Sequence, residues 1–434
     1  MSTSERSTTA PLTTWAGSHT YAAPVLHRPT TVDEVQQVVG AARRVRALGT
    51  RHSFNDLADS PGALLSLADL PEAIDVDSER RTVRVGGGTR YGTLAAVLHR
   101  EGWALHNLAS LPHISVAGAV ATATHGSGDR LPNLSAAVRG LELVTADGRL
   151  LNLGADHPSL AGAVVSLGAL GVVVAVTLAV EPTYDMVQEV HTDLPWSVAL
   201  EHLDQITASA DSVSLFTDWQ GPSIGQVWRK SRLDPGGTGW RATDELHGAR
   251  PATAQCHPVA GVDPRSTTAQ QGVAGPWHDR LPHFRMDFTP SHGVELQTEY
   301  LVPRDRAAEA IEAVRELGPR IAPLLLVSEI RTVASDDLWL STAYRQDSVG
   351  LHFTWQQRRA EVEALLPSIE QALAPVGPRP HWGKLFTATG AGSPEAIGAR
   401  YPRLDDFRRL ARELDPEGVF GNDYLVRHGV LAAR

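Results

Sequence analysis

Residues 110–128 of this chain read SLPHISVAGAVATATHGSG, and this run is the first candidate for a ligand-binding segment. Small side chains dominate it from residue 117 to residue 128. Such side chains let a ligand lie directly on the backbone, where successive N–H groups can cradle a pyrophosphate. A close-packed helix or turn has the same composition, so the run alone leaves both interpretations open.

The usual phosphate and nucleophile motifs are missing from the sequence. It contains no Gly-x-Gly-x-x-Gly at a strand–helix turn, so a Rossmann dinucleotide site is not expected. It also lacks a P-loop, a Gly-x-Ser-x-Gly elbow and a His-Glu-x-x-His motif. Any cofactor must therefore be held in another way.

Length and composition limit the class of protein. The chain has 434 residues, a formal net charge of -10 and one cysteine, Cys256. Domains usually have about 100–200 residues, so two or three domains are expected. One cysteine excludes an intramolecular disulfide and a multi-thiolate metal site. The acidic surplus argues against a nucleic-acid partner.

The first 180 residues predict a unit of mixed helices and strands with many glycine turns. The first 20 or so residues are rich in Ser and Thr and are expected to form a loose arm. The expected elements are a helix after the capping-box pattern 31–34, a strand at 45–48, a strand at 81–85, a helix at 91–100 and a hairpin at 141–153 with Asp147-Gly148 as a type I′ turn.

Residues 160–180 form a run of 21 residues without a charge, which is long enough to cross a bilayer. Glycines interrupt this run, and its second half is rich in valine. A buried helix, a glycine turn and a buried strand explain it, since no basic flank or aromatic belt accompanies it. The N-terminus does not resemble a secretory signal, so we expect a cytoplasmic protein without a membrane segment.

Two strands in the C-terminal half carry polar residues at alternating positions. We expect a helix at 304–317, strands at 324–333 and 349–356, a helix at 360–374 and a final tail of helices and loops. Alternation places Glu329 with Arg331 on one face, and His352 with Thr354 on one face. Facing a cavity, these side chains would suit a hydroxyl-rich small molecule; a solvent-facing amphipathic sheet has the same pattern.

Two further segments carry candidate ligand groups. Lys384 is surrounded by aromatic residues, and a shielded lysine near a guanidinium would lose its proton and become a base; a surface lysine is the alternative. Residues 49–55, GTRHSFN, follow an apolar strand. They could contact a ligand or form an ordinary loop.

Taken together, these motifs resemble flavoproteins of the vanillyl-alcohol oxidase type, and more closely the bacterial alditol (xylitol) oxidases. The resemblance covers nearly the whole chain after residue 14. It implies an α+β fold, with an FAD-binding domain of two α+β subdomains and a cap domain with a large antiparallel sheet flanked by helices. The motifs are HSFN, SLPHISVAG, THGSG and SLGALG, and in the second half SLFTDW, GPWHDRLPHF, EIRTV, HFTW and RPHWGK. The implied segments are an FAD-binding domain (1–180), a substrate or cap domain (181–390) and a C-terminal segment that returns to the FAD domain (391–434).

The resemblance also implies how FAD is held. His52 would carry FAD covalently through its imidazole, and the remote Cys256 fits a single point of attachment. In related sequences a small residue, often glycine, precedes this histidine; here it is Arg51, whose side chain we expect to contact a phosphate or alter the flavin potential. The other cofactor residues implied are Thr50, Arg51, Ser53, Phe54, Asn55, Ser110, Ser115, Gly118, Ala119, Val120, Ala121, His125, Gly171 and Val172.

The implied activity is oxidation of the C1 hydroxyl of an alditol to the aldehyde, with dioxygen reduced to hydrogen peroxide. Lys384, assisted by Arg331, would be the base; Arg331 alone is a poor base because its pKa exceeds about 12. The implied substrate residues are Ser110, Glu329, Arg331, His352, Thr354 and Lys384. An aldonolactone oxidase or dehydrogenase and a non-catalytic sugar-binding protein are the alternatives. We expect a polyol and dioxygen as partners, no nucleic acid, no membrane, no metal, and a monomer.

Overall fold

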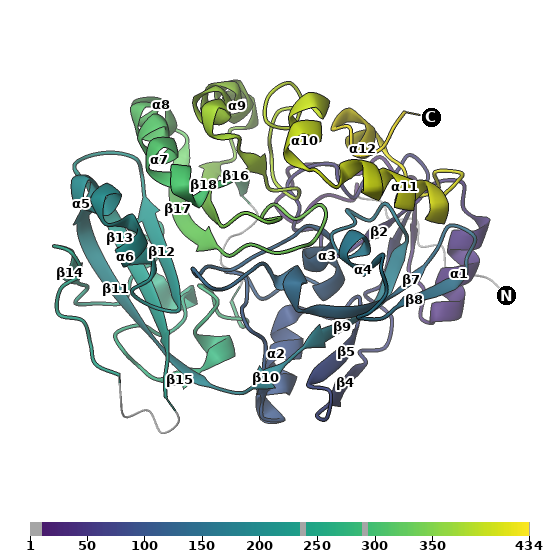
Figure 1. Cartoon of the computed structure of the whole chain (residues 1–434), viewed down its shortest axis with the longest axis horizontal. Helices are drawn as coiled ribbons and strands as arrows, with labels where there is room; N and C mark the ends of the chain where they lie inside the picture. Colours follow the sequence, from purple (N-terminus) through teal and green to yellow (C-terminus); the bar gives the residue numbers. More distant parts are fainter. Residues whose placement is uncertain (1–10, 235–239, 289–293, 434) are drawn as a thin grey trace.

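The computed structural model describes residues 11–234, 240–288 and 294–433. Two sheets arise from the N-terminal part of the chain (Figure 1). A parallel sheet has the order β1-β3-β2, and an antiparallel sheet has the order β4-β5-β9-β7-β8. Their strands are β1 (Val25–His27), β2 (Val45–Leu48), β3 (Ala63–Ser66), β4 (Ile74–Asp77), β5 (Thr82–Gly86), β7 (Val138–Val144), β8 (Leu150–Leu153) and β9 (Val172–Ala179).

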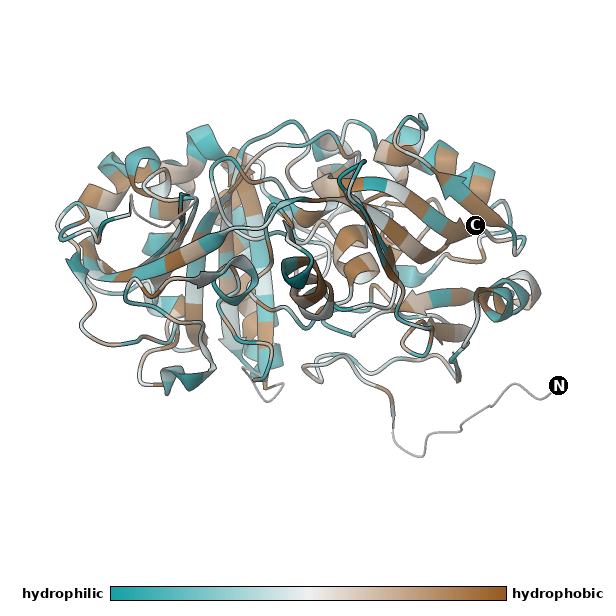
Figure 2. Cartoon of the chain, turned by 90° about the horizontal axis from the view of Figure 1, so that it is seen from below, coloured by the Kyte–Doolittle hydropathy of each residue, from teal (hydrophilic) through white to brown (hydrophobic). Residues whose placement is uncertain are grey.

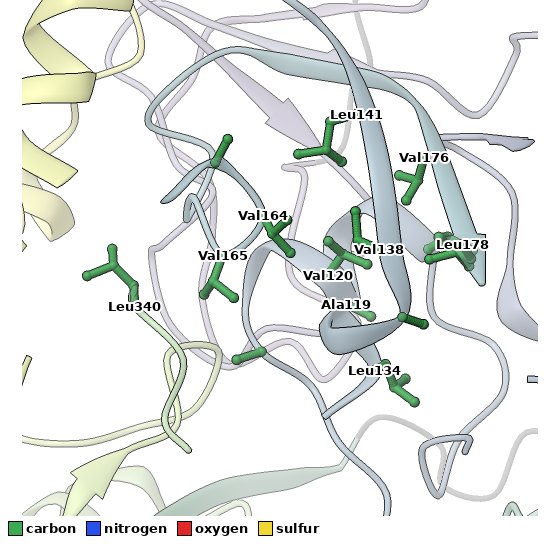
Figure 3. Packing of buried hydrophobic residues seen from close by; sticks show 14 of the residues in the cluster. Ala119, Val120, Leu134, Val138, Leu141, Val164, Val165, Val176, Leu178 and Leu340 are labelled. Atoms are coloured by element: carbon green, nitrogen blue, oxygen red, sulfur yellow. The ribbon is translucent and has the colours of Figure 1, made fainter. Parts of the chain in front are cut away.

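Short helices connect and cover these strands. Helix α3 lies within the small-residue run 110–128, and its buried face packs against β7 and β9, as the cluster around Ala119, Val120 and Val176 shows (Figure 3). The helices are α1 (Val32–Ala41), α2 (Tyr91–Arg100), α3 (Val116–Ala121) and α4 (Leu160–Ala163); the short strands β6 (Trp103–Ala104) and β10 (Glu181–Pro182) pair with each other.

The second half forms a nine-stranded sheet that confirms the predicted large sheet flanked by helices. Its main path runs β14-β11-β13-β12-β17-β18-β16-β19, and β15 pairs with β11. The strands are β11 (Asp185–Pro195), β12 (Ser212–Thr217), β13 (Ser223–Arg232), β14 (Arg250–Pro251), β15 (Gly275–Pro276), β16 (Glu295–Pro303), β17 (Leu325–Val333), β18 (Ser348–Gln356) and β19 (Arg379–Pro380).

The two faces of this sheet differ in chemistry. Hydrophobic and polar residues alternate along its long strands (Figure 2). Leu351, Phe353 and Trp355 of β18 pack against helices on one face, whereas His352 and Thr354 point to the other. The flanking helices are α5 (Trp196–Glu201), α6 (Leu203–Thr207), α7 (Ala307–Glu316), α8 (Gly318–Ile321) and α9 (Arg359–Leu373).

The C-terminal residues lie beside the N-terminal sheets (Figure 1). Tyr401, Phe407 and Tyr424 join the same buried cluster as residues of α2, β7 and β9. The Val45 N–H donates to the Val419 carbonyl at 3.0 Å. The helices of this tail are α10 (Pro394–Arg400), α11 (Leu404–Leu414) and α12 (Asp423–Arg427).

The structure corrects two local predictions. The hairpin is present, but its turn is not type I′, because Gly148 has a positive φ and Asp147 does not. Thr145 and Arg149 close a three-residue loop with Gly148 in the left-handed conformation, which is a type I turn with a bulge. The second correction concerns the expected loose arm. Residues 1–10 lie outside the described residues, but Thr14 and Ala16 are buried, so the arm is packed at these two positions.

The uncharged run 160–180 contains the predicted helix, glycine turn and buried strand in this order. Helix α4 is followed by Gly168 and Gly171, both with positive φ, and then by the buried strand β9. None of the helices in the described ranges combines the length and apolar character that a bilayer crossing requires.

Candidate functional site

One cavity of about 1170 Å³ lies between the small-residue segments and the polar face of the large sheet. It brings together most of the predicted site residues. These are Thr50, Arg51, His52, Ser53, Phe54, Ser110, Ser115, Gly118, Ala119, Ala121, His125, Gly171, Glu329, Arg331, His352, Thr354 and Lys384. The polar alternation therefore marks a cavity wall and not a solvent-facing sheet.

Three predicted cofactor residues do not line this cavity. The side chains of Val120 and Val172 are buried in hydrophobic clusters. Asn55 borders a smaller cavity of about 290 Å³, where its amide donates to the carbonyls of Trp382 and Lys384 at 2.9 and 2.8 Å. Asn55 thus fixes the backbone that carries Lys384.

One wall of the cavity is formed by residues 49–54 and by Ser115, Ala117, Gly118, Ala119 and Ala121. Ser115 N–H donates to Thr50 Oγ1 at 3.2 Å, which joins the two segments. A Cβ on Gly118 would come within 2.8 Å of Ser115 Oγ, so this approach leaves little room for a side chain. Among the described residues, the N–H groups of Arg51, His52 and Ser53 have no hydrogen-bond partner. Free N–H groups on a small-residue surface fit the pyrophosphate and ribityl chain of a flavin nucleotide.

His52 is held as a neutral imidazole. Its Nδ1 lies 3.0 Å from Thr50 Oγ1, and the Trp15 ring stacks on it at a centroid distance of 5.0 Å. Burial, helped by His113 and Arg90, lowers the pKa of His52 to about 4. A neutral imidazole keeps a lone pair for bonding at this edge of the cavity.

Arg51 adopts a left-handed backbone conformation, with φ +65°. Glycine adopts this conformation without strain, whereas a residue with a side chain adopts it only rarely. The Arg51 guanidinium donates to the Thr13 carbonyl at 2.9 Å, and Trp15 N–H donates to the Arg51 carbonyl at 2.7 Å. Arg51 therefore anchors the segment that carries Trp15.

A row of polar residues crosses three neighbouring strands on the opposite wall. Glu299 of β16 pairs with His352 of β18, which pairs with Glu329 of β17. Gln297 pairs with Thr354 one step along the same face. His352 Nε2 lies 3.2 Å from Gln297 Oε1, and burial beside Lys384 holds the pKa of His352 well below its ordinary value.

Glu299 is the centre of the charged cluster. Arg331 Nη2 donates to its Oε1 at 2.9 Å, and Lys384 Nζ lies 3.0 Å from its Oε2. Burial opposes ionisation, but Arg331 and Lys384 outweigh it and hold the pKa of Glu299 well below the ordinary value. Burial, together with Arg331 and against the pull of Glu299, lowers the pKa of Lys384.

Arg331 links the two carboxylates and the neighbouring loop. Its Nη1 lies 3.4 Å from Glu329 Oε2 and donates to Ser110 Oγ at 3.2 Å. The pKa of Glu329 lies well below its ordinary value, because Arg331 and His283 outweigh the effect of burial. Both carboxylates are therefore ionised acceptors at neutral pH.

His125, Glu299 and His381 have the spacing of a metal site, with candidate ligand atoms within 4.8 Å of one another. Glu299, however, is already engaged by Arg331 and Lys384. A divalent cation here would face two positive side chains, so we assign this group to the ion-pair cluster.

Sequence reasoning missed several residues of the site. Glu299 and Gln297 could have been found from the sequence. Residues 295–299 read ELQTE, and strand alternation places Glu295, Gln297 and Glu299 on one face. Trp15, His283 and His381 reach the site from loops, where no periodicity identifies them.

The chain is similar to known flavoproteins over almost its full length. Residues 23–154 match the model described as FAD binding domain, and residues 289–428 match that of D-arabinono-1,4-lactone oxidase. An alditol oxidase from a Streptomyces species is 50% identical over 95% of this chain and 98% of its own. An L-gulono-1,4-lactone dehydrogenase from Mycobacterium tuberculosis is 33% identical over 95% of this chain and 97% of its own.

The fold itself matches that of a solved oxidase. The crystal structure of cholesterol oxidase from B. sterolicum superposes with a TM-score of 0.77 over 96% of each chain, at 15% identity. At this identity the likeness concerns the fold alone.

Proposed function

Because this chain belongs to the alditol oxidases, FAD-dependent flavoproteins of the vanillyl-alcohol oxidase type, we propose that it oxidises the terminal C1 hydroxyl of alditols such as xylitol and sorbitol to the aldehyde. The observation that carries the proposal is the shared cavity. It joins a backbone surface suited to a flavin nucleotide to a wall of ionised and neutral polar side chains suited to a polyol. Dioxygen is the proposed electron acceptor and hydrogen peroxide the second product.

The residues around the backbone wall would hold FAD. When bound, FAD supplies the acceptor for the C1 hydride and passes the electrons to dioxygen. Free N–H groups at 51–53 and the small residues at 115–121 would contact the pyrophosphate and ribityl chain. The apolar stretch around Gly168 to Val173 would line the adenine side.

His52 is the proposed point of covalent attachment, through a bond from its imidazole to the 8α-methyl carbon of the flavin. The neutral imidazole and its contacts with Thr50 and Trp15 support this role, because they leave the ring oriented and unprotonated. The only cysteine, Cys256, does not line the cavity, which favours a single attachment.

Lys384 is the proposed base for the C1 hydroxyl proton. Its lowered pKa makes the neutral amine accessible at a lower pH than for an exposed lysine. Glu299 would stabilise the ammonium that forms when the amine takes the proton, because its Oε2 lies 3.0 Å from Nζ. Arg331 remains charged and would stabilise the developing alkoxide.

The other polar residues would select the substrate. Glu329 and Ser110 would bind hydroxyls next to the reacting carbon, and His352 and Thr354 would hold the far end of the polyol. Each hydroxyl that pairs with a buried charged group contributes about 1.5–3 kcal/mol. A molecule without these hydroxyls would leave the buried groups unpaired and bind more weakly.

Oxidation of an aldonolactone is the second candidate. The match of residues 289–428 to the D-arabinono-1,4-lactone oxidase model favours it, as does the lactone dehydrogenase relative. The greater identity to an alditol oxidase over a similar span makes the polyol the first choice.

A peroxide-coupled assay across alditols, aldonolactones and hydroxy acids tests the proposed function. We expect turnover with xylitol and sorbitol, and little with L-gulono-1,4-lactone. The purified protein should be yellow, and its flavin should stay with the acid-precipitated protein. A colourless protein that binds no added FAD would exclude flavin chemistry and leave a non-catalytic sugar-binding protein.

Three broader assignments belong to the same proposal. We propose the division 1–180, 181–390 and 391–434, because the tail packs into the core of the first segment. The cytoplasmic location and the monomeric state stay predictions. Cell fractionation and light scattering would test them.

A further inference from the structure

The chain contains 39 basic residues, and only two of them, Lys230 and Lys384, are lysines. Lys384 lines the cavity, whereas Lys230 lies on β13 with 1% of its surface exposed. Arginine keeps its charge in proteins, but a buried lysine can lose a proton. The proposed mechanism gives a role to Lys384 and none to Lys230.

Lys230 is connected to the cavity through two hydrogen bonds. Its Nζ lies 3.1 Å from His283 Nδ1, and His283 Nε2 lies 3.0 Å from Glu329 Oε1. His283 and Glu329 are each 4% exposed. The three residues form a buried polar chain that ends on a proposed substrate residue.

The contacts of Lys230 determine how His283 is protonated. Nζ also reaches the carbonyls of Leu281 and Pro282, at 2.5 and 3.1 Å. Three acceptors use all three hydrogens of an ammonium group, which has no lone pair to offer. His283 Nδ1 must therefore accept, so its single proton sits on Nε2 and is donated to Glu329 Oε1.

The surroundings hold this chain in place. The rings of Phe216 and Trp228 pack against the His283 ring in T-shaped arrangements, at centroid distances of 5.4 and 5.3 Å. The His283 N–H donates to the Ser110 carbonyl at 3.1 Å, which ties the same loop to a second proposed substrate residue.

We propose that Lys230 and His283 are positioning residues, which hold Glu329 ionised and oriented to recognise the hydroxyl next to the reacting carbon. This inference rests on the proposed function, because Glu329 meets a substrate hydroxyl only if a polyol occupies the cavity. The hydrogen-bonded residues Lys230, His283 and Glu329 thereby make a vicinal diol a requirement for tight binding of the substrate.

Loss of the Lys230 proton would undo this arrangement. Burial lowers the pKa of Lys230 to about 7; Glu329 opposes this shift and Arg280 adds to it. The other charged or titratable groups facing this polar chain are Arg331, beside both His283 and Glu329, and His352 and Lys384, which both interact with Glu329. A neutral amine has only two hydrogens for three acceptors and a lone pair of its own, so it no longer fixes the His283 proton on Nε2, where it is donated to Glu329. Substrate binding should therefore weaken as the pH rises through about 7.

The Lys230→Met variant tests the positioning role, with Gln188→Met as its control. Gln188 lies opposite Lys230 on β11, is equally buried and binds the neighbouring loop at Thr268, but does not contact His283 or Glu329. We expect Lys230→Met to raise KM for xylitol about tenfold or more, with kcat changed less than about threefold. Gln188→Met should leave KM unchanged.

A pair of small substrates separates positioning from general damage. Glycerol has a hydroxyl next to the reacting carbon, whereas propane-1,3-diol does not. Lys230→Met should raise KM for glycerol and leave KM for propane-1,3-diol unchanged. An equal rise for both would overturn the inference, as would no rise for either. If Lys230→Met does not fold, His283→Phe keeps the ring packing, removes both hydrogen bonds and should give the same pattern.

Carbon-13 labelling of lysine gives a readout that does not depend on turnover. The holoenzyme should show two Cε signals, and Lys230→Met identifies which one belongs to Lys230. We expect KM for xylitol in the wild-type enzyme to rise over the pH range in which this signal titrates, and Lys230→Met to lack that rise. A KM that stays constant across the titration contradicts the inference. A wild-type enzyme that oxidises no alditol would instead contradict the proposed function.

Discussion

The two walls of the cavity recognise their ligands by different means. The wall at residues 49–54 and 115–121 offers free backbone N–H groups and several small side chains, whereas the wall formed by β16, β17 and β18 offers buried charges. The first wall should be sensitive to added volume and tolerant of changes in charge. The second wall should be sensitive to changes in charge, because removing one charged partner leaves another charge buried and unpaired.

Lys384→Met tests the charged wall and carries the largest expected effect. Loss of a general base lowers turnover by about 10²–10⁴-fold, so kcat with xylitol should fall by that factor. The flavin content, measured from the visible spectrum, should stay at the wild-type level. Lys384→Arg should be equally inactive, because arginine keeps a charge but does not release its proton. Near-normal turnover in either variant would show that Lys384 is not the base.

Gly118→Val tests the backbone wall. Its Cβ would lie 2.8 Å from Ser115 Oγ, and the branched side chain would fill the surface proposed to hold the pyrophosphate. We expect at least a tenfold loss of bound flavin, measured as the ratio of absorbance at 450 and 280 nm. Gly398→Val is the control, because a Cβ on Gly398 meets nothing within 4 Å. Full flavin content in Gly118→Val would place the cofactor elsewhere.

Glu329→Gln removes a charge from the polyol wall without changing its size. We expect KM for xylitol to rise about 10–100-fold, since a hydrogen bond to a charged acceptor contributes about 1.5–3 kcal/mol. The value of kcat should change less, because Glu329 is proposed to bind a hydroxyl and not to move a proton. A fall in kcat with unchanged KM would assign Glu329 to the chemical step.

The pH dependence gives a smaller effect with a defined sign. Burial and Arg331 lower the pKa of Lys384, so its neutral form appears below the pH at which an ordinary lysine deprotonates. The kcat for xylitol should rise with pH and level off below the usual lysine range. A kcat that falls across the same range would require a protonated group, and would contradict a lysine base.

Much of the difference between the two cavity walls could be predicted from the sequence. Strand alternation correctly placed Glu329 with Arg331 and His352 with Thr354, because a period of two fixes which residues share a face. The same rule applied to residues 295–299 would have identified Glu299. His283 and Trp15 were not accessible in this way, because tertiary packing alone brings their loops to the site.

Local conformation was harder to predict than the pattern of faces. Asp147-Gly148 indicated a two-residue turn, yet the strands close at Thr145 and Arg149 around a three-residue loop. Val120 and Val172 belong to the expected segments, but their side chains face the core. A motif identifies a segment, whereas packing decides which of its residues reach the cavity.

Anaerobic reduction of the bound flavin tests most directly whether the two walls serve one reaction. Xylitol and L-gulono-1,4-lactone would each be mixed with the oxidised enzyme in a stopped-flow spectrometer, and the loss of absorbance near 450 nm recorded. We expect rapid and complete bleaching by xylitol, slow or no bleaching by the lactone, and one equivalent of hydrogen peroxide per aldose once dioxygen is admitted. Bleaching by the lactone with none by xylitol would contradict it.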